Sequence, residues 1–138
     1  MKYQYFVASR WRNRDIVFEL VEKLRAKGKT VYCFMENDPY HSPDDDPEEV
    51  MREYEATPEW QKTQMLADIF KKDMDGLKVS ENLVLLLPAG KSAHMEAGFA
   101  YCMGKKCIVV GEQKEAESLY LIFSERYDSI NTFIASLK

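Results

Sequence analysis

The sequence has few of the residues on which metal centres and disulfide frameworks depend. Among 138 residues it contains three cysteines and two histidines. The cysteines are odd in number and have no metal-type spacing, which predicts reduced thiols rather than a disulfide framework. Two histidines, His41 and His94, do not suffice to indicate a metal site. We therefore expect no metal and no cofactor.

Long apolar runs and an excess of positive charge are also missing. The longest apolar run, Leu83–Leu87, is far too short to span a bilayer. The apolar stretch near the N-terminus is shorter than a signal peptide needs and is followed at once by Arg10-Trp11-Arg12. The formal net charge is -4, so no global basic field attracts nucleic acid. We expect a cytoplasmic protein whose partners include neither a membrane nor a nucleic acid polymer.

Three motifs of nucleotide-binding and hydrolytic enzymes are absent as well. There is no Walker loop, and no G-x-G-x-x-G follows the first predicted strand. No G-x-S-x-G is present to support a Ser-His-Asp hydrolase. The function must therefore be sought in polar residues at other positions.

The composition that remains is that of an ordinary folded domain. The chain is long enough to bury a core. Its composition, 46% hydrophobic and 30% charged residues, is not that of a disordered protein. The run Tyr3–Ala8 predicts a first strand, Asp15–Lys27 carries a helical apolar stripe, and Thr30–Phe34 predicts a second strand. Such short connections are typical of a right-handed, parallel βαβ unit.

The second half of the chain continues this alternation. The pattern predicts helices at about Glu59–Val79, Ser92–Met103 and Tyr127–Leu137. It predicts strands at Leu83–Leu87 and Lys106–Val110, and either type at Ser118–Phe123. Apolar strands between helices indicate a sheet covered on both faces. We predict one α/β domain over residues 1–138, a doubly wound (flavodoxin/Rossmann-like) parallel sheet of four to five strands.

An acidic segment at about residues 36–55 interrupts the pattern. It holds nine carboxylates, three prolines and one basic residue, Arg52. We predict an exposed loop over Asn37–Asp46 and a short helix from about Pro47. The charges are interpreted first as solvated surface. The alternative is a flap over a site, because long loops inside compact domains are often functional.

Polar residues follow the first and third predicted strands, where doubly wound sheets bind their ligands. The first strand is followed by Ser9, Arg10 and Arg12, and the third by Gly90, Lys91 and Ser92. Hydroxyl groups, cationic side chains and two helix N-termini suit an anion such as phosphate. The alternative is that the arginines are ordinary surface residues.

Glu96 is the most informative residue. It lies early in the Ser92–Met103 helix and shares a predicted face with Phe99, Ala100 and Met103, which we expect to turn toward the sheet. A carboxylate held in a partly dry pocket can act as a nucleophile, as in retaining glycosidases. The alternative is a glutamate that only complements the helix dipole.

Asp73 is a second carboxylate on an apolar face. It shares that predicted face with Leu66, Ile69, Phe70 and Leu77. It can hydrogen-bond a base or a sugar hydroxyl of a ligand, or it can cap a neighbouring loop. Among other candidates, Trp11 and Trp60 are interpreted as packing residues, and His94 as a solvated turn residue.

One run of residues resembles a known family. The segment Gly90–Tyr101 contains Glu96-Ala97-Gly98-Phe99-Ala100 and is followed by Gly104-Lys105. It resembles the nucleoside 2-deoxyribosyltransferase family, whose superfamily includes deoxynucleoside monophosphate N-glycosidases. The turn after the first strand and an aspartate before the third, Asp73, also fit. The resemblance covers about residues 3–111.

The resemblance implies roles for these residues. Glu96 would be the nucleophile that attacks the anomeric carbon and releases the base, and Asp73 would hold the nucleoside. The further substrate-binding candidates are Ser9, Arg10, Arg12, Gly90 and Ser92. The resemblance also implies a pocket completed by a neighbouring subunit, and so a homodimer or a larger homo-oligomer.

The sequence departs from the family at defined positions. Family transferases carry an acidic residue about six positions before the catalytic glutamate, where this chain has Gly90. The glycosidases carry Ser and Gly in this loop, whereas Gly90 and Ser92 stand in the opposite order. We predict cleavage or transfer of an N-glycosidic bond of a (deoxy)nucleoside or nucleoside 5′-monophosphate. The alternatives are a non-catalytic nucleotide-binding or sensing module, and an interaction domain whose acidic segment meets a basic partner.

Overall fold

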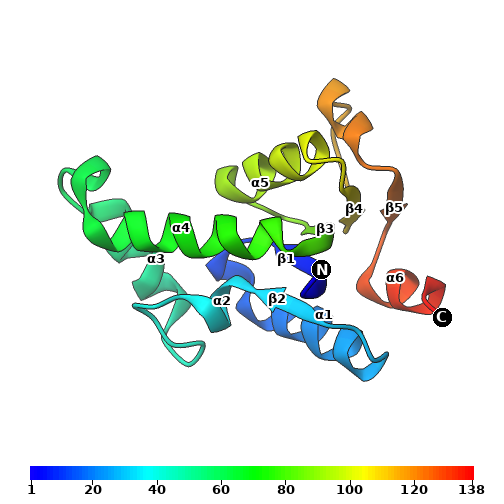
Figure 1. The fold of residues 1–138 in the computed structure, drawn as a ribbon, viewed down its shortest axis with the longest axis horizontal. Helices are drawn as coiled ribbons and strands as arrows, with labels where there is room; N and C mark the ends of the chain where they lie inside the picture. Colours follow the sequence, from blue (N-terminus) through cyan, green and yellow to red (C-terminus); the bar gives the residue numbers. More distant parts are fainter.

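Five strands pair side by side in one parallel sheet in the computed structural model, which describes residues 1–138 (Figure 1). The strands follow the order β2-β1-β3-β4-β5 across the sheet, and every neighbouring pair is parallel. Their bounds are β1 Tyr3–Ala8, β2 Val31–Cys33, β3 Ser80–Leu86, β4 Lys106–Val110 and β5 Glu125–Tyr127. The predicted fold class and strand number are confirmed.

Helices connect the strands and cover both faces of the sheet. The α-helices are α1 Arg14–Ala26, α2 Phe34–Asn37, α3 Pro47–Ala56, α4 Gln64–Lys78, α5 Lys91–Cys102 and α6 Ile130–Ser136. Three short 3₁₀ helices are η1 Trp11–Asn13, η2 Trp60–Lys62 and η3 Ser118–Ile122. No helix combines the length and the apolar composition that crossing a lipid bilayer requires.

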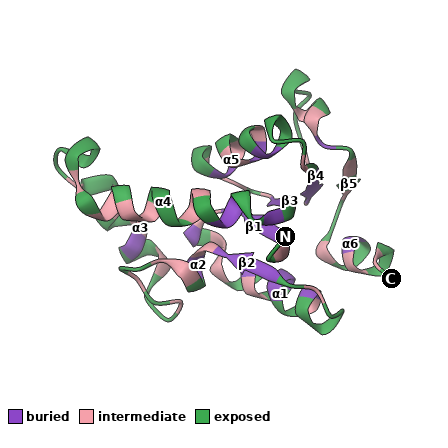
Figure 2. Ribbon diagram, viewed as in Figure 1, coloured by how far each residue is buried: buried purple, intermediate pink, exposed green.

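The core lies in two layers, one on each face of the sheet. On one face α1 buries Val17, Leu20, Val21 and Leu24, and α6 adds Phe133. On the other face α5 buries small side chains, and α4 adds Leu77. Figure 2 shows these buried residues along the strands and on the inner sides of the helices. Neighbouring side chains point to opposite faces of β1, so Val7 joins the first layer and Phe6 the second.

Two predicted elements differ from the structure near their ends. The long helix expected from Glu59 is divided, because Glu59 is left-handed (φ 48°) and Thr63 is extended, and α4 begins only at Gln64. The terminal helix expected from Tyr127 begins at Ile130, after the short strand β5. An edge strand needs few apolar residues, so β5 leaves little trace in the sequence.

The orientation of α5 corrects the prediction for Glu96. The residues that face the sheet are Ala93, Ala97 and Ala100. Phe99 and Met103, expected on the buried face with Glu96, are 43% and 41% exposed. Small side chains allow α5 to lie close to β3 and β4, so the helix turns its alanines inward. Glu96 lies at the margin of this face, toward the crevice described next.

The topology opens a crevice at the carboxyl ends of β1 and β3. The chain leaves β1 toward β2 on one side, whereas it leaves β3 toward β4 on the other. The connections therefore diverge between these two strands, which is where doubly wound sheets bind ligands. The loops after β1 and β3 and the N-terminus of α5 all lie at this point.

Candidate active site

A cavity of about 550 Å³ occupies the crevice. It is bordered by the loop after β1, the segment after β2, α3, α4 and the N-terminal half of α5. All the site residues predicted from the sequence line it: Ser9, Arg10, Arg12, Asp73, Gly90, Ser92 and Glu96. The topology therefore brings together residues that are up to 87 positions apart (96 minus 9).

Glu96 lines the cavity, and its carboxylate has no bonding partner within the chain. Its carboxylate makes no hydrogen bond and no ion pair, although the side chain lines the cavity and is mostly shielded from solvent. Burial raises the pKa of Glu96 to about 8, and the nearby negative charge of Asp73 adds to the effect. Once ionised, an unpartnered carboxylate here is available to react with a ligand.

Asp73 lies beside Glu96 but is held more firmly. The hydroxyl of Tyr32 donates to Oδ1 of Asp73 at 3.0 Å. Burial raises the pKa of Asp73 to about 7, the Tyr32 hydrogen bond opposes this, and Asp38 adds to it. Oδ2 of Asp73 makes no hydrogen bond within the chain and is open to a ligand. The negative charge of Asp73 raises the pKa of Glu96, so the ionisation of Glu96 depends on the charge state of Asp73.

One end of the cavity is suited to an anion. Lys91 and Ser92 begin α5, and no side chain caps the free N–H groups of this end. Lys91 makes no ion pair, and Arg10 makes only one long hydrogen bond, 3.4 Å from Nε to Oδ1 of Asn13. Two cationic groups without carboxylate partners therefore stand near a helix N-terminus.

Two of the predicted phosphate contacts are engaged in other bonds. Arg12 pairs with Glu48 and with Glu55 of α3, each at 3.0 Å. Ser9 donates to the carbonyl of Leu86 at 2.9 Å and accepts from the side chain of Asn13. The ion pairs of Arg12 thus link α3 to the loop after β1, and the hydrogen bond of Ser9 links the end of β1 to β3.

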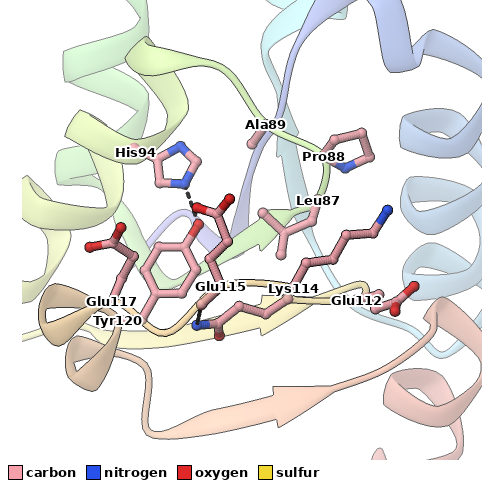
Figure 3. Close-up of a pocket in the computed structure, with 10 residues that line it drawn as sticks. Leu87, Pro88, Ala89, His94, Glu112, Lys114, Glu115, Glu117 and Tyr120 are labelled. Atoms are coloured by element: carbon pink, nitrogen blue, oxygen red, sulfur yellow. Dashed lines mark hydrogen bonds between the residues drawn. The ribbon is translucent and has the colours of Figure 1, made fainter.

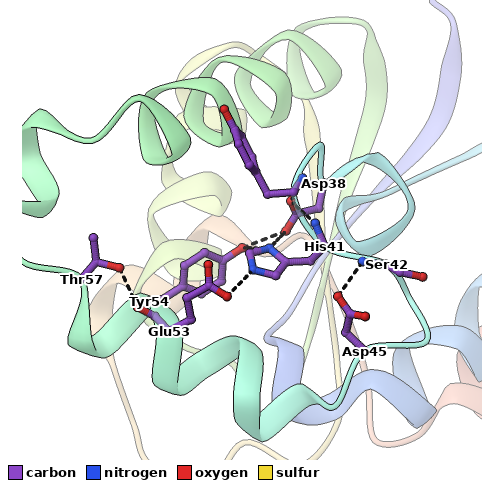
Figure 4. Close-up of polar contacts among 8 residues, drawn as sticks. Asp38, His41, Ser42, Asp45, Glu53, Tyr54 and Thr57 are labelled. Carbon is purple, nitrogen blue, oxygen red and sulfur yellow. Dashed lines mark hydrogen bonds and ion pairs between the residues drawn. The ribbon is translucent and has the colours of Figure 1, made fainter.

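Eight of the nine carboxylates in the acidic segment are exposed, as the interpretation of solvated surface predicts, whereas Asp38 borders the cavity. Within the predicted exposed loop, the side chains of Asp38 and His41 are only 3% and 6% exposed. They bond to each other and to Tyr54 and Glu53 of α3 (Figure 4). The predicted helix from Pro47 is confirmed as α3. The interpretation as solvated surface was wrong for Asp38 and His41, because α3 folds back over them.

Sequence reasoning missed the apolar wall of the cavity. Phe34, Met51, Leu66 and Ile69 line it together with Asp38 and Tyr54. Only Leu66 and Ile69 gave a signal, as apolar neighbours of Asp73 on α4. Phe70, expected on the same face, is 65% exposed.

The two tryptophans have different environments. Trp11 is buried and meets Phe34 edge to face, with ring centroids 6.2 Å apart. This confirms the packing prediction for Trp11, which also lines the cavity. Trp60 is 57% exposed, so the packing prediction was wrong there: its short helix η2 precedes α4 and has no buried residue.

His94 lines a second cavity of about 500 Å³, together with residues of the loop between β3 and α5 and of the segment after β4 (Figure 3). Nδ1 donates to the carbonyl of Gly90 at 2.8 Å, and Nε2 is hydrogen-bonded to the hydroxyl of Tyr120 at 2.6 Å. The two rings also stack, 13° from parallel. The prediction of a solvated turn residue was wrong, because η3 folds against the start of α5.

The comparisons with known proteins identify the fold. No family model matches the chain, and no curated protein matches its sequence. A solved 2-deoxyribosyltransferase of Bacillus psychrosaccharolyticus superposes with a TM-score of 0.70 at 17% identity, covering 94% of this chain and 89% of that one. A CMP N-glycosidase of Clostridium botulinum superposes with a TM-score of 0.55 at 19% identity, covering 96% of each chain. At these identities the likeness establishes a shared fold.

Proposed function

We propose that the protein hydrolyses the N-glycosidic bond of a nucleoside 5′-monophosphate, with Glu96 as the nucleophile. The observation that carries the proposal is the Glu96 carboxylate, which is unpartnered and shielded in a cavity large enough for such a ligand. The fold is shared with a 2-deoxyribosyltransferase and a CMP N-glycosidase, which supports the reaction class.

The reaction divides into two steps. The ionised Glu96 attacks the anomeric carbon, a bond forms from its oxygen to that carbon, and the carbon–nitrogen bond breaks. The electron pair leaves with the base, which takes a proton from solvent. Water then attacks the same carbon, loses a proton and releases Glu96. Asp73 orients the sugar through its free Oδ2, while Tyr32 holds Oδ1.

The anion end of the cavity supports a phosphorylated substrate. Arg10, Lys91 and the N-terminus of α5 offer positive charge and free N–H donors close to Glu96. Hydrolysis is favoured over base exchange because Gly90 stands where family transferases carry an acidic residue.

The test is the release of free base from a panel of nucleosides and their 5′-monophosphates, followed by chromatography. We expect release from at least one monophosphate, and a loss of about a thousandfold or more in Glu96→Ala. Glu81→Gln is the matched control, because Glu81 is an exposed carboxylate on β3 outside the cavity. The absence of release from every compound would reject the proposal.

A binding module without turnover is the second candidate. It is supported by the raised pKa values of Glu96 and Asp73, since a protonated carboxyl group can bind a ligand but cannot attack it. This candidate predicts thermal stabilisation by a 5′-monophosphate without base release, and similar stabilisation of Glu96→Gln.

A further inference from the structure

The network at the apolar end of the cavity begins with Asp38, whose carboxylate is fully occupied. Oδ1 accepts from the backbone N–H of Tyr40 at 2.8 Å and from that of His41 at 3.1 Å. Oδ2 accepts from the His41 ring at 3.0 Å and from the Tyr54 hydroxyl at 2.8 Å. A carboxylate has about four acceptor sites, so Asp38 has none left for a ligand.

His41 supplies the positive charge of this network. Its Nδ1 lies 3.0 Å from Asp38, and its Nε2 lies 3.0 Å from Oε2 of Glu53. Both neighbours are acceptors, so both ring nitrogens donate, and the ring is an imidazolium ion. The other groups packed on the ring are Tyr54 and Trp11. The ring pairs with the Asp38 carboxylate, which can only accept hydrogen bonds.

Tyr54 lines the cavity together with Asp38 and, unlike Asp38, keeps a free acceptor position. Its hydroxyl donates to Oδ2 of Asp38, a hydrogen bond marked in Figure 4. Nδ1 of His41 lies 3.3 Å from the same oxygen and occupies a further position around it. The phenolic oxygen therefore offers the cavity a lone pair and no proton. Turning the proton toward a ligand would remove one of the two donors that Oδ2 of Asp38 has, which disfavours that orientation.

The walls around Tyr54 suit a flat ring. Phe34, Met51, Leu66 and Ile69 line the cavity together with Tyr54. With the phosphate at the α5 N-terminus and the sugar at Glu96 and Asp73, the base of the proposed substrate falls in this compartment. The polar group it meets there is the acceptor oxygen of Tyr54.

We infer that this compartment selects a base that carries an exocyclic amino group, and that Tyr54 is the specificity residue. An amino group places an N–H against the Tyr54 oxygen, whereas a carbonyl in its place sets two lone pairs against each other. The substrate class is therefore an amino-bearing nucleoside 5′-monophosphate. The inference rests on the proposed function for the placement of the base.

The experiment compares two matched pairs of 5′-monophosphates, cytidine with uridine and adenosine with inosine, which differ in an amino or an oxo group. Base release is measured with wild type, and binding is measured by calorimetry with Glu96→Ala. We expect the amino member of at least one pair to be favoured by about tenfold or more. In Tyr54→Phe this ratio falls toward one, chiefly because the amino member becomes weaker. The control Tyr40→Phe also loses a hydroxyl, but one that bonds Asp68 on the surface, and it should keep the wild-type ratio.

The outcomes separate the inference from the proposed function. Release without preference, or a preference that survives in a folded Tyr54→Phe, overturns the inference and leaves the glycosidase proposal intact. Binding with the expected preference but no release overturns the glycosidase proposal and supports the inference. The absence of both binding and release overturns both. Thermal melting of each variant shows whether it is folded. Asp38→Asn replaces an acceptor oxygen and so frees the Tyr54 proton. This variant should therefore lose the preference as Tyr54→Phe does.

Discussion

Gly76 of α4 lies directly against the ring of Tyr32, so that a β-carbon built on it would stand 2.7 Å from Cδ2 of that ring. The Tyr32 ring has no room to retreat, since it stacks on Phe6 with centroids 5.0 Å apart and meets Tyr3 edge to face. This contact places the Tyr32 hydroxyl beside Asp73, one turn earlier on α4. A glycine that does not line the cavity thus helps to set the position of a site carboxylate.

We expect Gly76→Ala to destabilise the protein despite the better helix propensity of alanine. The gain in propensity is about 1 kcal/mol. Overpacking against a fixed ring costs about 1–3 kcal/mol, and the clash therefore prevails. Urea denaturation measures the difference. Gly98→Ala is the control, because a β-carbon there meets nothing within 4 Å, and it should be neutral or stabilising. If both variants gained stability, the close contact would have no energetic weight.

The hydrogen bond from Tyr32 to Asp73 can be tested separately with Tyr32→Phe. This bond lowers the pKa of Asp73 against the larger effect of burial, so its loss should raise that pKa further above about 7. We expect the rising limb of kcat/KM against pH to move to higher pH, measured with the 5′-monophosphate that is cleaved best. Tyr3→Phe removes a hydroxyl that makes no hydrogen bond within the chain and should leave the profile in place. An unshifted profile in Tyr32→Phe would contradict a role for Asp73 in the ionisation of the pair.

Much of the fold could be predicted from the sequence because it depends on local patterns. Apolar segments such as Lys106–Val110 alternate with amphipathic helices, and this alternation specifies a parallel sheet. The approximate site followed from topology alone, since strands that run in parallel bring their carboxyl ends to the same edge. Ser9 and Gly90 were placed at one crevice for this reason.

The rest depends on contacts between distant residues, which leave no periodic signal. The pairing of Arg12 with Glu48 and Glu55 spans 36 and 43 positions. The bond from Tyr32 to Asp73 spans 41 positions. An acidic segment has the same composition whether it is solvated or folded back over a buried histidine, so Asp38 and Tyr54 could not be distinguished from surface residues.

The stability of the protein should depend on pH through Glu96. Its pKa is raised from 4.5 to about 8 in the folded protein. A group with a raised folded pKa contributes stability that is fully present below the unfolded pKa, about 4.5, and that is lost as the pH rises through about 8. The Glu96→Gln side chain does not ionise. We expect the free energy of unfolding of Glu96→Gln, relative to that of wild type, to increase by on the order of 2 kcal/mol between pH 5 and pH 9. Urea denaturation at both pH values checks this. Glu81→Gln should show no such change, and a constant difference between Glu96→Gln and wild type would mean that the carboxyl group is well hydrated.

The two arginines after β1 should differ in their effect on catalysis, although they are only two positions apart. Arg10 has no carboxylate partner, whereas Arg12 is bonded to Glu48 and Glu55. A charge-assisted hydrogen bond contributes about 1.5–3 kcal/mol, so Arg10→Ala should lower kcat/KM for the 5′-monophosphate by about tenfold to a hundredfold. Its effect on the unphosphorylated nucleoside should be small. Arg12→Ala should instead lower the stability slightly, since exposed ion pairs are weak, and should affect both substrates alike. Steady-state kinetics with both substrates separate the two roles. A larger phosphate-specific loss in Arg12→Ala than in Arg10→Ala would show that the ion pairs with α3 open when the phosphate binds, and would reverse the assignment.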